Sequence, residues 1–297
     1  PMAQADATPQ PVTPPGPWIF PRRFDLTIFL VPLAGAAVAS LYLLWGEAKA
    51  MPLWGFVLFI VTFDVAHVWS TVYRTYLDPD ERKRRPVLLW LPIPVFLFLS
   101  FRLHLHSPVL FWTLLAYVAI YHFIKQNYGF LMMYKRRGGE RSAFDFYLDK
   151  WTLWAGALGP VLWWHATPKR NFDWFNAGES FILRIEPSFI RDISIVYFGF
   201  LALYAGRQFQ RWVQDRHFNA GKQLIMGAHF VTWAVGIRFT DNLLVSAAFL
   251  NLFHGIPFLA LVWYTTNRKW APGESNDTPP PPAPAEPVPE TTPPWSQ

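Results

Sequence analysis

Four histidines lie inside long apolar stretches of the chain, where an imidazole could bind a metal ion or move a proton. They are His67, His122, His229 and His254. Placing an ionisable group at the centre of a membrane helix costs roughly 2.5 to 3.5 kcal/mol, so such residues are usually retained for a function. We therefore take these four histidines as candidate metal ligands.

Three other polar residues share a helix face with one of these histidines, because residues three apart in a helix lie on one stripe. The pairs are Asp64 with His67, Lys125 with His122, and Asn251 with His254. Asp64 could bind the metal directly or orient an imidazole as a hydrogen-bond acceptor. Asn251 could form a hydrogen bond with one of the imidazole ligands without binding the metal itself. Lys125 could pair with Asp64, extend toward the lipid headgroups, or bind an oxygen of a substrate.

Residue types narrow the chemistry. The chain contains no cysteine, which excludes thiolate ligands, disulfides and cysteine-held iron–sulfur clusters. Imidazole and carboxylate ligands with open positions suit non-haem iron, with zinc and copper as alternatives. Histidines on facing helices could instead bind b-type haem, so haem b remains the alternative cofactor.

The elements that must position these residues are membrane-spanning helices. Hydrophobic residues make up 52% of the 297 residues, and they gather in windows long enough to cross a bilayer. The sequence predicts an all-α, polytopic bundle of about eight transmembrane helices. The predicted spans are 26–45, 53–76, 86–103, 108–134, 145–166, 188–206, 223–240 and 243–266. Arg191 and Asp192 interrupt the sixth span, and without it the count would be seven.

Basic residues collect in alternate loops, as the positive-inside rule requires of cytoplasmic loops. The segments 77–85 and 135–141 each hold four Lys or Arg residues, and 207–222 is also basic, whereas 239–242 holds none. The protein is therefore expected in a bacterial inner membrane with both termini on the cytoplasmic side. This requires an even number of membrane-spanning helices. The net charge of +6 is expected to attract anionic membrane lipids, and no nucleic-acid partner is implied.

The four histidines lie at similar predicted depths in the membrane. At about 1.5 Å per residue, His67 lies roughly 15 Å from the predicted cytoplasmic end of its helix, and His122 and His254 each lie roughly 18 Å from theirs. His229 lies roughly 9 Å deep by the same rise. All four occupy a band between the membrane centre and the cytoplasmic face, which favours a shared site.

The ends of the chain differ in composition from the bundle at 25–268. Residues 1–24 and 269–297 are rich in proline, and such segments cannot bury a core. We expect both to be disordered. The tail could bind a protein partner through its Pro-Pro runs or could simply be solvated.

Two short elements resemble a known family. Tyr121-His122-Phe123 and Phe253-His254-Gly255 resemble the His-Phe and His-Gly elements of the Brp/Blh-type carotene dioxygenases, which are polytopic bacterial membrane proteins. Their order along the chain differs from that of the family. The resemblance implies an intramembrane iron held by histidines from separate helices, and oxygen-dependent cleavage of a carotenoid. The closely spaced histidine boxes of membrane desaturases are absent.

The sequence thus favours a membrane oxidoreductase with histidine-bound iron, acting on an apolar substrate such as a carotenoid, acyl chain or sterol. Two other classes stay open, apart from a haem-binding electron-transfer subunit. A transporter could use the same polar residues as a proton or substrate path. A non-catalytic subunit of a membrane complex could use them for helix packing.

Overall fold

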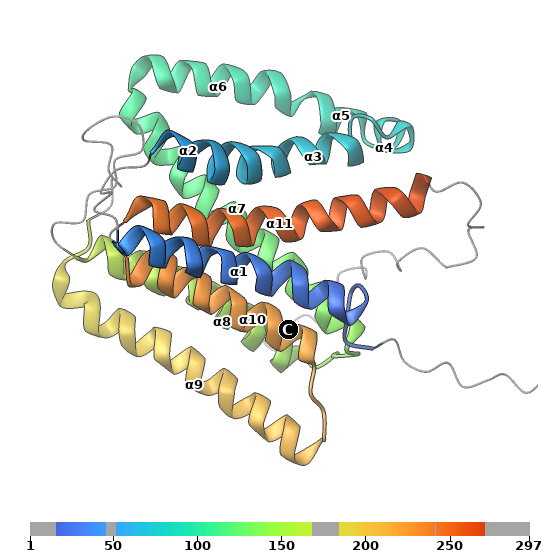
Figure 1. The fold of residues 1–297 in the computed structure, drawn as a ribbon, viewed down its shortest axis with the longest axis vertical. Helices are drawn as coiled ribbons and strands as arrows, with labels where there is room; N and C mark the ends of the chain where they lie inside the picture. The colour runs from blue at the N-terminus through green and yellow to red at the C-terminus, as the bar shows by residue number, and fades with distance from the viewer. Residues whose placement is uncertain (1–15, 46–51, 168–183, 241, 271–297) are drawn as a thin grey trace, which may run out of the picture.

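The structure is a computed structural model, and it describes residues 16–45, 52–167, 184–240 and 242–270. In this part of the chain all regular secondary structure is helical and there is no β-strand (Figure 1), which confirms the predicted all-α class. Residues 16–21 precede the first helix, and Phe20 among them is buried. The predicted disorder is wrong for residues 22–24 and 269–270, which lie in the helices Arg22–Trp45 and Leu243–Trp270. Residues 1–15 and the tail from 271 onward lie outside the described residues.

Fourteen helical elements follow one another along the described parts of the chain. They are α1 (Arg22–Trp45), α2 (Leu53–Gly55), the π-helix η1 (Phe56–Val65), α3 (Ala66–Arg74), α4 (Pro79–Arg84), α5 (Pro86–Trp90), α6 (Pro92–His106), α7 (Pro108–Arg137), α8 (Ala143–His165), the 3-10 helix η2 (Pro187–Phe189), α9 (Ile190–Gln214), α10 (Ala220–Trp233), the π-helix η3 (Ala234–Arg238) and α11 (Leu243–Trp270).

Local sequence signals set several helix starts. Prolines occupy the first turn of α4, α5, α6 and α7, where their missing N–H costs nothing. The side chains of Ser107, Ser142 and Asn219 accept hydrogen bonds from backbone N–H groups at the starts of α7, α8 and α10, as good N-caps do. Asp78 caps α4 in the same way.

Six of the described helical segments are long and apolar enough to cross a membrane. They are Arg22–Leu41, Leu53–Arg74, Pro86–His106, Pro108–Arg137, Pro187–Gln214 and Leu244–Asn267. These segments are compatible with a multi-pass membrane protein. The sixth predicted span is among them, as α9. The predicted spans 145–166 and 223–240 are helices in the structure, α8 and α10 with η3, but they are not among the six.

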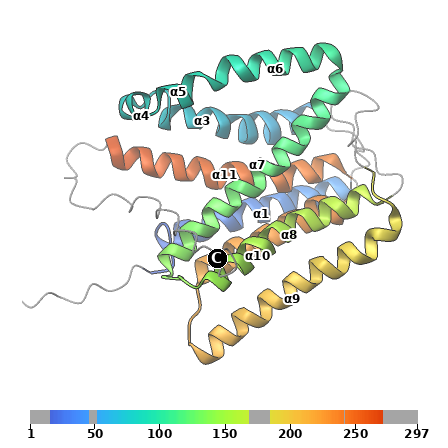
Figure 2. The ribbon, with the colours of Figure 1, turned by 180° about the vertical axis from the view of Figure 1, so that it is seen from behind.

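The helices lie side by side in a slab, with α6 at one edge and α9 at the other (Figure 1). Helix α11 is central and packs against α1, η1, α3 and α10. In the apolar segment of α11, 61% of the residues are buried inside the protein, whereas none are buried in the segment that includes α6. Helix α7 crosses the slab diagonally on its other face (Figure 2) and contacts α6, α8, α10 and α11. Side chains of α3, α7 and α11 can therefore meet.

Candidate metal centre

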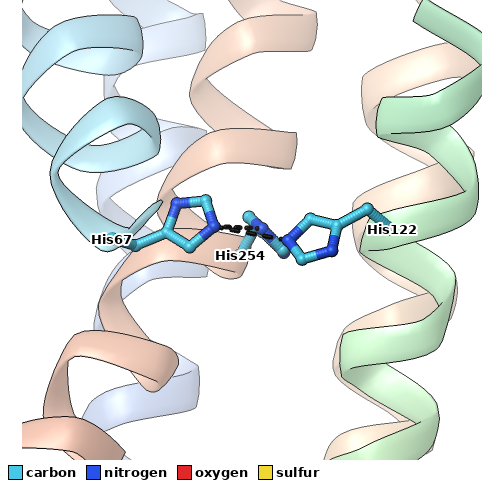
Figure 3. A group of neighbouring side chains, drawn as sticks. All are labelled: His67, His122 and His254. Atoms are coloured by element: carbon cyan, nitrogen blue, oxygen red, sulfur yellow. Dashed lines mark hydrogen bonds between the residues drawn. The ribbon is translucent and has the colours of Figure 1, made fainter. Parts of the chain in front are cut away.

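Three of the four predicted histidines converge from three different helices (Figure 3). The Nε2 atom of His67 lies 2.9 Å from Nε2 of His254 and 3.5 Å from Nε2 of His122. One ligand atom from each ring lies within 4.8 Å of the other two. We call His67, His122 and His254 the histidine centre.

Helix α11 brings His254 close to His67 because the next residue is glycine. A Cβ atom at Gly255 would lie 2.5 Å from the carbonyl oxygen of Phe63 in η1, which is closer than packed atoms allow. The π-helical turns of η1 end just before His67, and such turns are frequent at functional sites. The close approach of α11 and η1 thus brings His254 and His67 together in the centre.

Aromatic rings and one amide hold the histidines in place. The ring of Phe123 stacks on His254 with centroids 3.9 Å apart, and Phe258 meets His67 edge to face at 5.7 Å. The Nε2 group of Gln126 donates a 2.7 Å hydrogen bond to the backbone carbonyl of His254. His67 and His254 are buried, whereas His122 is exposed, so the centre is open on the side of α7.

Two of the three separations between these nitrogens match those of ligands around one ion. With metal–nitrogen bonds of about 2.0 to 2.1 Å, two ligands at a right angle lie about 2.9 Å apart and two at a tetrahedral angle about 3.4 Å apart. The observed separations of 2.9 and 3.5 Å fall at these values. Three such ligands leave positions open for water or substrate, as in catalytic sites.

Asp64 lies on the outer side of His67. Its Oδ1 atom is 3.5 Å from Nδ1 of His67, the ring nitrogen that does not face the other two histidines. A carboxylate in this position favours the tautomer with hydrogen on Nδ1 and leaves Nε2 free to bind a metal. The structure thus places Asp64 where it can orient an imidazole, and not among the grouped ligand atoms.

His229 is not brought to this centre. It is fully buried in α10, and both of its ring nitrogens have protein partners. Asn127 Nδ2 lies 3.1 Å from its Nδ1, and its Nε2 lies 2.9 Å from the carbonyl oxygen of Leu153. These contacts tie α10 to α7 and α8. The depth of His229 can be read from the sequence, but the direction of its ring cannot.

The other two predicted residues lie near the centre without joining it. Lys125 is exposed on α7, and its ammonium group lies over the ring of Tyr128 at 5.3 Å. Asn251 is buried in α11, one turn before His254. Neither is grouped with the three ligand atoms.

A second cluster of polar groups is not predicted by the sequence pattern. Lys135 and Lys222 are buried, and each ammonium group contacts the carboxylates of both Glu140 and Asp149. Arg211 lies 3.0 Å from Glu140. We call these five residues the ion network. From the charge pattern alone, the basic residues of this network are assigned to cytoplasmic loops. The feature of the sequence that could have indicated a buried network is the pair of carboxylates at 145 and 149 in an apolar helix.

Glu140 lies in the connection between α7 and α8, and its side chain is fully buried. Burial alone would raise the pKa of this carboxyl group, but the positive charges of Lys222, Lys135 and Arg211 lower the pKa to about 2. Glu140 is therefore ionised at neutral pH and neutralises the cations around it. The network joins the ends of α7, α8, α9 and α10.

Comparison of the chain with known protein families, with curated proteins and with solved structures finds no match. The resemblance to carotene dioxygenases therefore gains no support from relatives, and the function rests on the site itself.

Proposed function

We propose that the protein is a membrane oxidoreductase that holds a non-haem iron at the histidine centre and acts on an apolar lipid or carotenoid substrate. The observation that carries the proposal is the convergence of three imidazole nitrogens from α3, α7 and α11 at ligand spacing. Neutral imidazoles are good ligands for iron. When bound, iron would supply the activation of dioxygen.

The chain's own residues would then hold the ligands and admit the substrate. Asp64 orients His67, and Phe123 and Gln126 fix His254. The exposed side of the centre continues along α7, where Val118 is 60% exposed and lies one turn before His122. Because an exposed apolar stripe on a membrane helix faces lipid, a hydrophobic substrate would enter from the bilayer. Lys125, one turn beyond His122, would bind a polar end of that substrate.

The short separations of His67 from His254 and from His122 favour a non-haem ion over haem. Two axial ligands on opposite sides of one iron would lie about 4.1 Å apart with metal–nitrogen bonds of the length above, and a porphyrin ring would have to fit between them. The Nε2 atoms of His67 and His254 are 2.9 Å apart, and their rings meet edge to face. This arrangement suits neighbouring positions around a small ion.

We further propose that the chain crosses a bacterial inner membrane eight times, with both termini on the cytoplasmic side. At about 1.5 Å per residue, α8 is about 34 Å long and α10 with η3 about 28 Å. These lengths compare with a hydrocarbon core of about 30 Å. Helix α10 packs against α1 and α11, and α8 packs against α9 and α10, so both contact helices that are candidate crossings.

The test is metal analysis with an optical spectrum on the detergent-purified protein and on His67→Ala and His254→Ala. We expect about one iron per chain, no Soret band, and loss of the iron in both variants. A Soret band would show the haem alternative instead. Iron that is absent from the wild type after growth with added iron, or retained in both variants, would contradict the proposal.

A further inference from the structure

A surface pocket lies at the end of α9 that we place in the cytoplasm. Its volume is about 390 Å³, within the range of ligand pockets of about 300 to 1,000 Å³, and it is lined by Gln208, Phe209, Trp212, Phe218 and Gln223. The three aromatic side chains are each more than half exposed, although α9 is mostly polar after Gly206. Exposed aromatic residues gathered around a pocket mark a binding surface.

A short series of hydrogen bonds ends at this pocket. The hydroxyl group of Tyr204 donates to Oε1 of Gln223 at 2.9 Å, and Nε2 of Gln223 donates to Oε1 of Gln208 at 2.9 Å. The direction of both bonds follows from Tyr204, because its hydroxyl hydrogen has no other acceptor in the described part of the chain. Nε2 of Gln208 is therefore the last donor, and it has no protein partner there. An occupant that presents a carbonyl oxygen would satisfy it, since a buried donor left unpaired is unfavourable.

The chain itself contains a segment of matching chemistry. Ten of the 27 residues after Trp270 are proline, and residues 284–290 read PAEPVPE, with prolines three apart at 284 and 287. Segments of this composition favour the polyproline II helix, whose backbone carbonyls make no internal hydrogen bonds. Such helices dock in grooves lined by aromatic residues. The pocket offers both the aromatic rings and a free amide donor.

The charges of the segment and of the pocket are complementary. The residues after Trp270 carry four acidic side chains and no basic one. Two arginines of α9 beside the pocket are already paired with carboxylates. Arg216 is exposed in the connection between α9 and α10, two residues before Phe218, and the described residues include no ion-pair partner for it. It is therefore available to a glutamate of the segment, Glu286 or Glu290.

The segment can reach the pocket from the end of α11. Figure 1 shows the end of α11 and the connection between α9 and α10 at the same end of the slab, on the right. Helix α10 packs against α11 and bonds to α9 through Gln223, so the pocket lies two helices away from α11. At about 8 to 10 Å per pair of packed helices, this is roughly 20 Å across the slab. Residues 271–283 span up to about 43 to 47 Å when extended, which leaves ample length.

We propose that residues 284–290 bind in this pocket of the same chain as a polyproline II helix. The prolines pack against the three aromatic side chains, a backbone carbonyl accepts from Nε2 of Gln208, and a glutamate pairs with Arg216. The docked segment shields aromatic rings that otherwise face water. This binding surface is separate from the histidine centre and does not depend on iron.

Photocrosslinking tests the proposal on the full-length protein in lipid nanodiscs. The chain has no cysteine, so Thr291→Cys places a benzophenone maleimide just beyond the segment without changing it. After illumination, we expect crosslinks to residues 207–223 of the same chain. Mixing protein of two isotope compositions separates crosslinks within one chain from crosslinks between two chains.

Matched variants identify the pocket as the site. Phe209→Ala and Trp212→Ala, each added to Thr291→Cys, should lower the yield of these crosslinks severalfold. Phe198→Ala is the control and should leave the yield unchanged. Phe198 is as exposed on α9 as Phe209, but it lies about 16 Å further back along the helix at about 1.5 Å per residue. The melting temperature checks that each variant is folded.

Charge gives an independent reading. Arg216→Glu should lower the yield severalfold, because it repels the glutamates of the segment. Adding Glu286→Lys together with Glu290→Lys should restore the yield. High salt should lower the yield of the unexchanged protein, since a solvent-exposed ion pair is screened.

Three results would overturn the proposal. Crosslinks found only between two chains would assign the pocket to the tail of a second copy. Adducts with lipid and none with 207–223 would assign the pocket to a membrane lipid. Crosslinks to 207–223 that persist unchanged in both Phe209→Ala and Trp212→Ala would mean that the segment does not use the pocket.

Discussion

At the scale of single residues, the four predicted histidines divide into two groups with different partners. His67, His122 and His254 turn Nε2 toward one another, whereas His229 uses both nitrogens to join helices. Residue type, depth and helix face are readable from the sequence for all of them. The direction of each ring depends on how helices far apart in sequence pack, and one sequence does not contain that information in readable form.

This division predicts opposite results for two substitutions. His254→Ala should abolish metal binding, because it removes one of three ligands. His229→Ala should leave the metal content unchanged and lower the free energy of unfolding by about 1 to 3 kcal/mol, since Asn127 loses a buried partner. Elemental analysis and thermal unfolding of the two variants measure both quantities. Loss of metal in His229→Ala with an intact fold would assign it to the centre after all.

Asp64 carries a prediction of a different kind. Asp64→Asn keeps the size of the side chain but removes the charge beside His67 Nδ1. Metal affinity should fall about 10- to 100-fold without being lost, as it does for other residues that orient a ligand. Titration against a competing chelator measures the change. Complete loss of binding, comparable to that in His67→Ala, would mean that Asp64 is itself a ligand.

At the scale of elements, the sequence predicts helices well where hydropathy and caps agree. The eight predicted spans correspond to helices in the described residues, including α9, whose start carries Arg191 and Asp192. The π-helical turns of η1 and the burial of the ion network are not predicted. Apolar periodicity does not distinguish a π-helix from an α-helix over ten residues, and loop charge does not reveal which lysines fold inward.

The contact between α11 and η1 can be tested with two glycines. Gly255→Ala should force the helices apart at Phe63, lowering both thermal stability and metal affinity. Gly227→Ala in α10 is the matched control, because a Cβ there meets nothing within 4 Å. This control should raise stability by about 0.5 to 1 kcal/mol, the usual gain for alanine over glycine in a helix. Equal effects of the two changes would contradict the role of Gly255.

At the scale of the whole molecule, two polar clusters connect the bundle. The histidine centre joins α3, α7 and α11, and the ion network joins α7, α8, α9 and α10. Helix α7 belongs to both and crosses the slab between them (Figure 2). A change in either cluster therefore acts on α7, the helix that both clusters hold.

The ion network predicts a dependence of stability on pH. The pKa of Glu140 is lowered from 4.5 to about 2, so its contribution is present above pH 4.5 and disappears as the pH falls toward 2. Glu140→Gln should lower the free energy of unfolding at pH 7 by about 3 to 5 kcal/mol, because the buried Lys135 and Lys222 are then left with the single carboxylate of Asp149. The difference between wild type and variant should shrink between pH 4.5 and pH 2. A difference that stays constant over this range would contradict the assignment.

Cysteine labelling tests the number of crossings, and the chain has no cysteine of its own to interfere. With eight crossings, a cysteine in place of the exposed Glu186 reacts with an impermeant maleimide from outside, and one in place of the exposed Asp215 reacts only from the cytoplasm. With six crossings that omit α8 and α10, the two sides are exchanged. Cysteine substituted for His106 should react from outside in both cases and serves as the control.

The most direct test of the account is X-ray absorption spectroscopy of the purified, iron-loaded protein. We predict about one iron per chain with three imidazole nitrogens at roughly 2.0 to 2.1 Å, by analogy with other histidine-bound metals, and loss of this signal in His67→Ala. An iron spectrum without imidazole scattering, or no bound metal at all, would contradict a metal centre at these three histidines.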